Sequence, residues 1–270
     1  MSATAVQVRE HYDSLALVYR AFWGDHLHHG LFERGDETPD EAQEKLVKLC
    51  VALAGVKGGE RVLDVGCGHG ATAIYLAQTH DCRVVGLTLS EKQVRIAREN
   101  AAAAGVSERI SFLVGDADDY DLGREQYDLV WTMESSEHFR GKAAYFCRAA
   151  DALLPHGLLL LAAWTGCMQD ARAQAVANAF LCPSLQTSEE YCGQLCAAGL
   201  SIVEHADLTD RVARTWDICL ERSRTAGIGL RLLPAAIRLF IEGIPLILQA
   251  YRSGALRYTV IVARKESQGK

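Results

Sequence analysis

The chain has 270 residues, of which 49% are hydrophobic, which is enough for one large α/β domain with a sizeable buried core. Its formal net charge of −6 argues against nucleic acid as a partner, because phosphate binding needs a basic face. Residues 1–20 have no apolar core, and the chain has no uncharged apolar stretch of about 18 residues, so we expect neither a signal peptide nor a transmembrane segment, and a cytoplasmic protein.

The N-terminal segment, residues 6–34, begins with a helical pattern and then becomes irregular. It is rich in aromatic residues and ends in a crowd of histidines without the spacing of other metal ligands, so we expect no metal site. We interpret the segment as a lid over the glycine-rich turn at residues 66–70; the alternative is an arm that covers the core and carries solvated histidines. The residues concerned are Tyr12, Tyr19, Trp23, His26, His28 and His29.

After an amphipathic helix at 40–54, strands and helices alternate along the chain. The strands are short and rich in Val and Leu, as is typical of a parallel sheet that is covered by helices on both faces. We expect strands at 61–66, 83–88, 110–114, 127–132, 158–164, 201–206 and 256–263, and helices at 71–79, 91–104, 139–153, 167–181, from Thr187 to Gly199 and over most of 211–252. Thr187 and Glu190 fit a capping box at the start of their helix.

The helices that interrupt this alternation are expected to form a cap on the sheet. The apolar helix 237–248 within the cap has three possible roles: it lines a substrate pocket, packs as core or docks on a membrane surface. The predicted division is an N-terminal lid at 1–40, an α/β core at 41–164, a cap helix at 165–186, more core at 187–209, a helical cap at 210–254, and a final strand and tail at 255–270.

The glycine-rich turn suggests a bound nucleoside. Gly66, Gly68 and Gly70 alternate between a buried strand and the start of a helix. Glycine adopts positive φ and lets a ligand approach the backbone, and the helix start offers free N–H groups. The dinucleotide fingerprint has its third glycine three positions after the second, whereas the third glycine here is two positions after, which disfavours NAD.

The stretch Asp64-Val65-Gly66-Cys67-Gly68-His69-Gly70 is similar to the first motif of class I S-adenosylmethionine-dependent methyltransferases, an acidic residue followed by G-x-G-x-G. The resemblance implies a Rossmann-like fold. It also implies that the glycines and Cys67 admit the methionine and ribose parts of the cofactor, and that Asp64 holds its ammonium group directly or through water.

Two further strand ends extend the resemblance. The pattern G-x-T-L-S-x-x-Q, with Thr88, Leu89 and Gln93, resembles the branch of γ-tocopherol methyltransferases, sterol methyltransferases and cyclopropane fatty acid synthases, and implies that these residues hold the ribose. Ser90 and Gln93 also fit a capping box, which needs no cofactor.

After the third strand, the resemblance implies that Asp116 and Ala117 contact adenine. We expect the following Asp118, Asp119 and Asp121 to form a solvated turn.

The fourth strand ends in Trp131-Thr132-Met133-Glu134-Ser135-Ser136-Glu137-His138. Ligands of open parallel sheets bind at the carboxyl ends of the strands, so Glu134, Glu137 and His138 are expected near the methyl donor, and Met133 at the cofactor. His138 is the candidate general base, since its reference pKa of about 6.5 suits neutral pH. Glu134 is expected to orient His138, or to stabilise a cationic substrate or the sulfonium, and Glu137 to lie on the surface.

The pattern W-x-M-E-S-x-E-H also resembles the tocopherol methyltransferase branch, as do the tract 23–30 and the ending Tyr251-Arg252-Ser253-Gly254. The substrate would be a flat or amphipathic molecule packed on aromatic residues, whose faces also attract a sulfonium or ammonium. The candidate substrate residues are Tyr12, Tyr19, Trp23, His28 and Trp164.

The sequence therefore predicts a seven-stranded, mostly parallel Rossmann-like sheet with a helical cap. It predicts an enzyme of natural product biosynthesis that methylates C, N or O of a small aromatic or amphipathic metabolite and releases S-adenosylhomocysteine. The alternatives are lipid-directed cyclopropane synthesis, disfavoured by the acidic balance, and a non-catalytic cofactor-binding protein. Peripheral membrane contact and the oligomeric state stay open.

Overall fold

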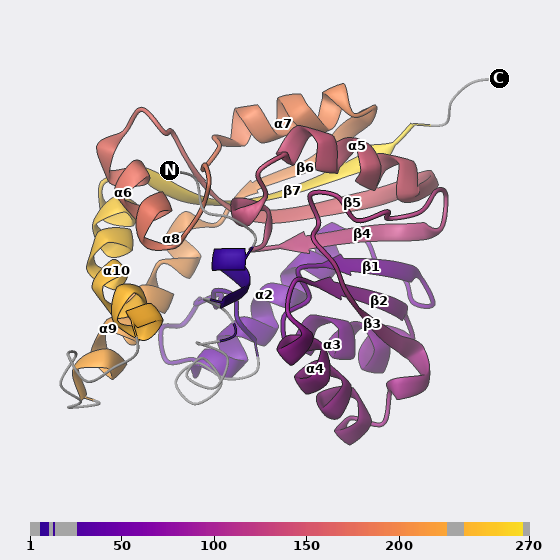
Figure 1. The fold of residues 1–270 in the computed structure, drawn as a ribbon, viewed down its shortest axis with the longest axis horizontal. Helices are drawn as coiled ribbons and strands as arrows, with labels where there is room; N and C mark the ends of the chain where they lie inside the picture. Colours follow the sequence, from indigo (N-terminus) through magenta and orange to yellow (C-terminus); the bar gives the residue numbers. More distant parts are fainter. Residues whose placement is uncertain (1–5, 11–12, 14–25, 226–234, 267–270) are drawn as a thin grey trace.

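The computed structural model describes residues 6–10, 13, 26–225 and 235–266. Their strands form one seven-stranded sheet in the order β3-β2-β1-β4-β5-β7-β6 (Figure 1). Neighbouring strands are parallel except at β7, which runs antiparallel to both β5 and β6. This confirms the expected sheet. The strands are β1 Arg61–Val65, β2 Arg83–Thr88, β3 Ile110–Val114, β4 Tyr127–Met133, β5 Leu153–Gly166, β6 Leu200–Asp207 and β7 Leu256–Lys265.

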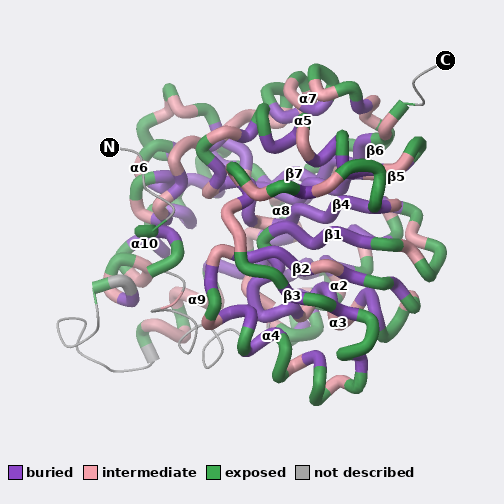
Figure 2. The backbone as a smooth tube through the Cα atoms, turned by 45° about the vertical axis from the view of Figure 1, so that its right-hand side comes forward, coloured by how far each residue is buried: buried purple, intermediate pink, exposed green. Residues whose placement is uncertain are grey.

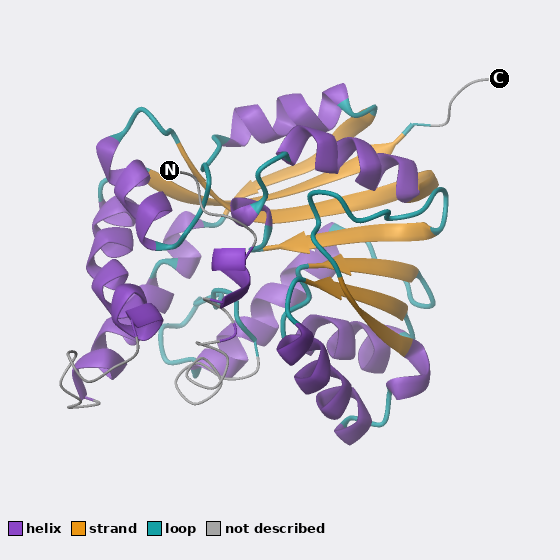
Figure 3. Ribbon diagram, viewed as in Figure 1, coloured by secondary structure: helices purple, strands orange, loops and turns teal. Residues whose placement is uncertain are grey.

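Helices cover both faces of the sheet (Figure 3). The helices are α2 Pro39–Leu53, α3 Ala71–His80, α4 Glu91–Ala103, α5 Lys142–Ala152, α6 Ala171–Ala179, α7 Ser188–Ala197, α8 Thr209–Val212, α9 Arg214–Thr225 and α10 Ala235–Arg252, with single 3-10 turns at η1 Ser107–Arg109 and η2 Ser136–His138. The expected capping box at Thr187 and Glu190 is present at the start of α7.

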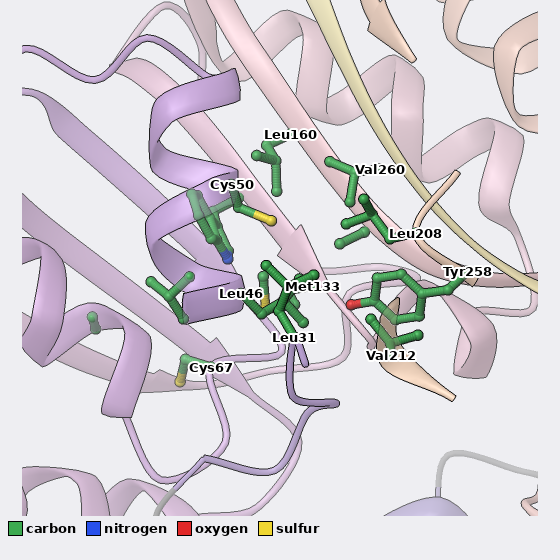
Figure 4. Close-up of a cluster of buried hydrophobic side chains, with 14 of the residues drawn as sticks. Leu31, Leu46, Cys50, Cys67, Met133, Leu160, Leu208, Val212, Tyr258 and Val260 are labelled. Atoms are coloured by element: carbon green, nitrogen blue, oxygen red, sulfur yellow. The ribbon is translucent and has the colours of Figure 1, made fainter. Parts of the chain in front are cut away.

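The alternation of side chains along each strand creates two hydrophobic cores. On β1, Val62 belongs to the core under α2, α3 and α4, whereas its neighbour Leu63 belongs to the core under α5 and α7. The central strands are therefore buried on both faces, whereas exposed residues lie on the edge strands β3 and β6, on the outer sides of the helices and at loops (Figure 2). Part of the first core, including Leu46, Cys50 and Leu160, lies between α2 and the sheet (Figure 4).

The strand order places a switch point between β1 and β4. From β1 the chain moves outward through β2 to β3, and then returns to pair β4 with the other side of β1. The loops that leave the carboxyl ends of β1 and β4 therefore run in opposite directions, and a crevice opens between them. The glycine turn and the stretch from Glu134 to His138 both lie at this crevice.

Helices α6, α9 and α10 gather beyond the carboxyl ends of the parallel strands (Figure 1). The buried side of α10 packs as core through Ile244, Ile247 and Leu248, while Leu239 and Leu246 are exposed. Within the described residues, no helix is long and apolar enough to cross a membrane. The division of the chain into lid, core and cap stays a prediction.

Several element boundaries differ from the expected ones, and for two of them the structure shows the cause. The helix expected at 139–153 begins only at Lys142, because the Asp118 carboxylate accepts the backbone N–H groups of Arg140 and Gly141 and holds them outside the helix. The strand expected at 158–164 begins at Leu153, which pairs with Tyr127 ahead of a register shift in β4.

Candidate active site

One cavity at the switch point brings together most of the residues singled out in the sequence. It is lined by the ends of β1, β2 and β4, by the loop after β3, and by residues 26–28 from the N-terminal segment. Gly70 is not among the lining residues, because it caps the start of α3. The predicted site residues on the cavity wall are His28, Asp64, Gly66, Cys67, Gly68, Thr88, Leu89, Gln93, Asp116, Ala117, Met133, Glu134 and His138.

The glycine turn has a backbone that other residues adopt only at a cost. Gly66, Gly68 and Gly70 have φ values of +86°, +52° and +80°. A Cβ atom on Gly66 would lie 2.2 Å from the Cβ of Ser135 in the loop after β4. The turn can therefore approach the β4 loop closely only because position 66 has no side chain.

Asp64 is a buried carboxylate that lacks a full set of partners. Its residue is 3% exposed, and Oδ2 has no hydrogen-bond partner. Burial raises its pKa to about 7. A buried carboxylate of this kind is costly unless a cationic or donor group reaches it. Because Asp64 also lines the cavity, it fits the ammonium group of a bound amino acid moiety.

The end of β2 fixes the side chain of Gln93. Thr88 Oγ1 donates to Gln93 Oε1 at 2.5 Å, and the backbone N–H of Gln93 donates to Ser90 Oγ at 3.0 Å. Ser90 thus caps α4, while the Gln93 side chain bonds to Thr88 beside the cavity.

An unpredicted arginine joins the loop after β3 to the loop after η2. Arg140 donates to Asp116 Oδ2 at 2.8 Å and to Asp118 Oδ2 at 2.9 Å, and it lines the same cavity. Asp116 Oδ1 accepts the backbone N–H of Asp118 at 3.0 Å. The expectation that Asp118 is merely solvated is therefore wrong, whereas Asp116 keeps its place on the cavity wall.

Glu134 lies at the centre of a cluster of hydrogen-bond donors. Its carboxylate accepts the backbone N–H and the Nδ1 of His29, each at 2.8 Å, the Tyr258 hydroxyl at 2.8 Å and the Trp164 indole N–H at 3.1 Å. Burial opposes its ionisation, but the attraction of the His29 ring and the bonds that it donates lower the pKa of Glu134 to about 2. Glu134 is therefore an ionised structural anchor, with a backbone φ of +48°.

The partner of Glu134 is His29, and sequence reasoning did not select His29. Trp216 donates its indole N–H to His29 Nε2 at 2.7 Å. An indole nitrogen is only a donor, so Nε2 of His29 accepts, and Nδ1 donates toward Glu134. The bonds of Glu134 thus hold the N-terminal segment, and none of those described joins it to His138. The expected roles of Glu134 toward His138, a cationic substrate or the sulfonium stay predictions.

His138 lies on the cavity wall, with Nδ1 3.4 Å from the carbonyl oxygen of Leu181. Glu137, expected at the surface, is instead 2% exposed, because it accepts the backbone N–H of Trp164 at 2.6 Å from β5. Burial raises the pKa of Glu137 to about 8.

The predicted substrate residues have mixed outcomes. Tyr12, Tyr19 and Trp23 lie outside the described residues. His28 is buried on the cavity wall, and His29 is 1% exposed, so the alternative of solvated histidines is wrong for both. Trp164 is not among the cavity-lining residues; its ring packs on His29, Phe180 and Trp216 behind Glu134.

Comparisons with known proteins agree with this geometry. The profile of the mycolic acid cyclopropane synthetase family matches residues 2–225. The 27-O-demethylrifamycin SV methyltransferase of Amycolatopsis mediterranei is 30% identical over 226 residues, which are 81% of this chain and 82% of that protein. The chloroplastic tocopherol O-methyltransferase of Arabidopsis thaliana is 28% identical over 284 residues, 96% of this chain and 81% of that protein.

The fold also matches solved structures. The mycolic acid cyclopropane synthase CmaA1, complexed with SAH and CTAB, has a TM-score of 0.86 and 22% identity over 98% of this chain and 99% of that chain. The cofactor of the present chain is S-adenosylmethionine, and the unpartnered Oδ2 of Asp64 and the open glycine turn fit the methionine part of such a molecule. The chain belongs to the mycolic acid cyclopropane synthetase family and is a class I S-adenosylmethionine-dependent methyltransferase.

Proposed function

We propose that the enzyme transfers a methyl group to a hydroxyl of a small, largely apolar or aromatic specialised metabolite. The observation that carries the proposal is that the glycine turn, Asp64 and His138 line one and the same cavity. Both relatives named above are methyltransferases of small molecules, and the names of both place the methyl group on oxygen.

Different residues of the cavity would bind different parts of the cofactor. Asp64 would hold the ammonium group of the cofactor, Thr88 and Gln93 its ribose, and Asp116 its adenine. Cys67, Leu89, Ala117 and Met133 would shape the walls beside it. Arg140 would fix Asp116 through the ion pair described above.

S-adenosylmethionine supplies a methyl group that is already activated on sulfur, so the protein mainly aligns the acceptor and removes a proton. His138 would accept that proton. Its Nδ1 lies 3.4 Å from the carbonyl oxygen of Leu181, a contact that helps to hold the ring on the cavity wall. Glu134 would act at a distance, by anchoring the segment that contains His28 through His29.

A second candidate is methyl transfer to an unsaturated lipid chain, followed by cyclopropane formation. The family match over residues 2–225 favours it. An alkene carbon has no proton to lose before methyl transfer, so the two candidates differ in what the cavity must recognise.

A turnover assay would separate these candidates. Labelled S-adenosylmethionine is incubated with the enzyme and a panel of phenols, aliphatic alcohols, amines and vesicles of unsaturated phospholipid, and products are identified by mass spectrometry. We expect methyl ethers from hydroxyl compounds. In that reaction His138→Gln should lower kcat roughly 100-fold or more, as is usual for loss of a general base, with little change in cofactor affinity.

Products from the vesicles alone would replace the first candidate with the second. Products from amines alone would move the acceptor to nitrogen. An unchanged kcat in His138→Gln would assign the proton to another group.

A further inference from the structure

Two histidines of the N-terminal segment form a hydrogen-bonded pair on the cavity wall. His26 and His28 both line the cavity, together with Gly66, Met133 and His138. His26 Nδ1 lies 2.9 Å from His28 Nε2, and the two rings pack edge to face with centroids 4.8 Å apart. Neither contact is explained by holding the cofactor or by His138 as the base.

The backbone under this pair is fixed by other elements. Gln43 on α2 donates its side-chain N–H groups to the carbonyls of His26 at 2.8 Å and His28 at 3.2 Å. Gly30 donates its N–H to Thr215 Oγ1 at 3.0 Å, and Glu134 holds His29 from the end of β4. The two rings are therefore presented to the cavity by a rigid loop.

The hydrogen bonds determine where the protons lie on both rings. His28 Nδ1 is 2.8 Å from the carbonyl oxygen of His29, which only accepts, so this nitrogen carries a proton. Burial lowers the pKa of His28 and lowers that of His26 to about 3, so both rings are neutral near pH 7. Neutral His28 then accepts at Nε2, and His26 must donate from Nδ1.

This chain of donors leaves His26 with a bare Nε2. We propose that His26 Nε2, oriented by His28, accepts a hydrogen bond from the hydroxyl group of the methyl acceptor. The inference rests on the proposed function in one respect, that the ligand of this cavity is the methyl acceptor. It adds a reason for selectivity: a hydroxyl compound satisfies His26, whereas a methyl ether or an alkene leaves a partly buried acceptor without a donor.

The position of the protons can be tested without a substrate. Long-range proton–nitrogen NMR spectra of ¹⁵N-labelled protein at pH 7 distinguish protonated from bare ring nitrogens, and His26→Phe identifies the signals of His26. We expect both His26 and His28 to be neutral, with protons on Nδ1. A proton on Nε2 of His26, or a charged His26, would overturn the proposal.

The role in binding is tested with the hydroxyl compounds that turn over in the panel. His26→Phe should lower kcat/KM about tenfold, which is the upper range for loss of one neutral hydrogen bond. Affinity for S-adenosylhomocysteine, measured by calorimetry, should stay within about twofold and serves as the check that the variant folds. His26→Gln keeps an acceptor oxygen near the position of Nε2 and should restore part of the loss.

The matched control is His205→Phe, at an exposed position on β6 far along the sheet. It should leave kcat/KM unchanged. An unchanged kcat/KM in His26→Phe contradicts the proposal. If no hydroxyl compound in the panel is turned over, the proposed function and the ligand assigned to His26 are both contradicted. The NMR spectra still test the proton positions on His26 and His28, because they need no substrate.

Discussion

Asp64 is a residue whose burial works directly against the stability of the free protein. Burial raises its pKa to about 7, whereas an aspartate in an unfolded chain titrates near 3.9. Between these two values the folded state holds a proton that the unfolded state has lost, so this group lowers the stability of the free protein as pH rises through the window. A cationic group of the bound cofactor would offset this loss of stability by pairing with the carboxylate.

Asp64→Asn should therefore stabilise the free protein and weaken cofactor binding. The neutral amide avoids the burial of a charge, so at pH 7.5 the free energy of unfolding in urea should rise by on the order of a few kcal/mol, at about 1.4 kcal/mol per pKa unit. In the natural protein, affinity for S-adenosylhomocysteine should fall up to roughly tenfold for each pH unit below 7, because binding must release the Asp64 proton.

Calorimetry across pH 5.5–8 measures both effects, and Asp119→Asn, at an exposed position of the loop after β3, is the control. The pH dependence should disappear in Asp64→Asn and persist in Asp119→Asn. An affinity that is equally strong in Asp64→Asn would remove Asp64 from the cofactor site.

His29 and Glu134 show where single-residue reasoning from sequence stops. The tract of histidines was visible, and so was the acidic residue after the fourth strand, but the two are 105 positions apart and nothing local links them. The available signals were that the tract 23–30 and the pattern around Glu134 resemble the same methyltransferase branch, and that the N-terminal segment was expected to cover the glycine turn. Asp64, by contrast, could be predicted as a site residue, because Gly66 and Gly68 of the same motif lie only two and four positions after it.

At the scale of elements, the turn after β1 and the loop after β4 pack so closely that position 66 cannot carry a side chain. Gly66→Ala should lower the free energy of unfolding through two separate contributions, one from the backbone and one from steric overlap. The left-handed backbone costs about 1–2 kcal/mol for any L-residue, and the overlap with Ser135 adds about 1–3 kcal/mol as the loops move apart. Affinity for the cofactor should fall as well, since the turn shifts.

Gly105→Ala measures the backbone contribution by itself and so separates it from the steric contribution. Gly105 also has a positive φ, of +73°, but a Cβ there meets nothing within 4 Å. Urea unfolding should show only the backbone cost for Gly105→Ala and a larger loss for Gly66→Ala. An equal loss of unfolding free energy in the two variants would mean that the loop after β4 moves away from the new side chain at no measurable cost.

The elements were predictable wherever the sequence pattern is local. Runs of Val and Leu located the strands, because a strand buried on both faces needs apolar residues throughout. The start of α5 was not predictable, because Asp118, from another loop, accepts the N–H groups of Arg140 and Gly141 and fixes their backbone outside the helix. Local propensity was overruled there by one tertiary contact.

At the scale of the whole molecule, the order of strands decides which distant segments meet. The alternation of strands and helices predicts a parallel sheet, and the resemblance implied the Rossmann-like order that brings β1 next to β4. The packing of α6, α9 and α10 did not follow from any pattern, because their apolar faces fit several arrangements. The acceptor-binding side of the cavity is therefore less determined by sequence than the cofactor side.

The cavity wall contains residues from the N-terminal segment, the glycine turn and the ends of β2 and β4, so a bound cofactor should stabilise parts of the molecule that are far apart in sequence. S-adenosylhomocysteine at about 100 times its dissociation constant should add ~2.7 kcal/mol to the free energy of unfolding. For a chain of 270 residues this corresponds to a rise in Tm of roughly 5 °C.

The segments in which the ligand slows hydrogen exchange test the proposed cofactor site more specifically than the total gain in unfolding free energy. Amide hydrogen exchange should slow at 26–31, 64–70, 87–93 and 133–138, because these segments surround the cavity, while β6 at the edge of the sheet should change little. Asp64→Asn, at the same ligand concentration, should reduce the protection in all four segments together. Protection of 64–70 and 87–93 without 26–31 would show that the N-terminal segment does not close over the cofactor, and would leave His26 and His28 to act on the acceptor alone.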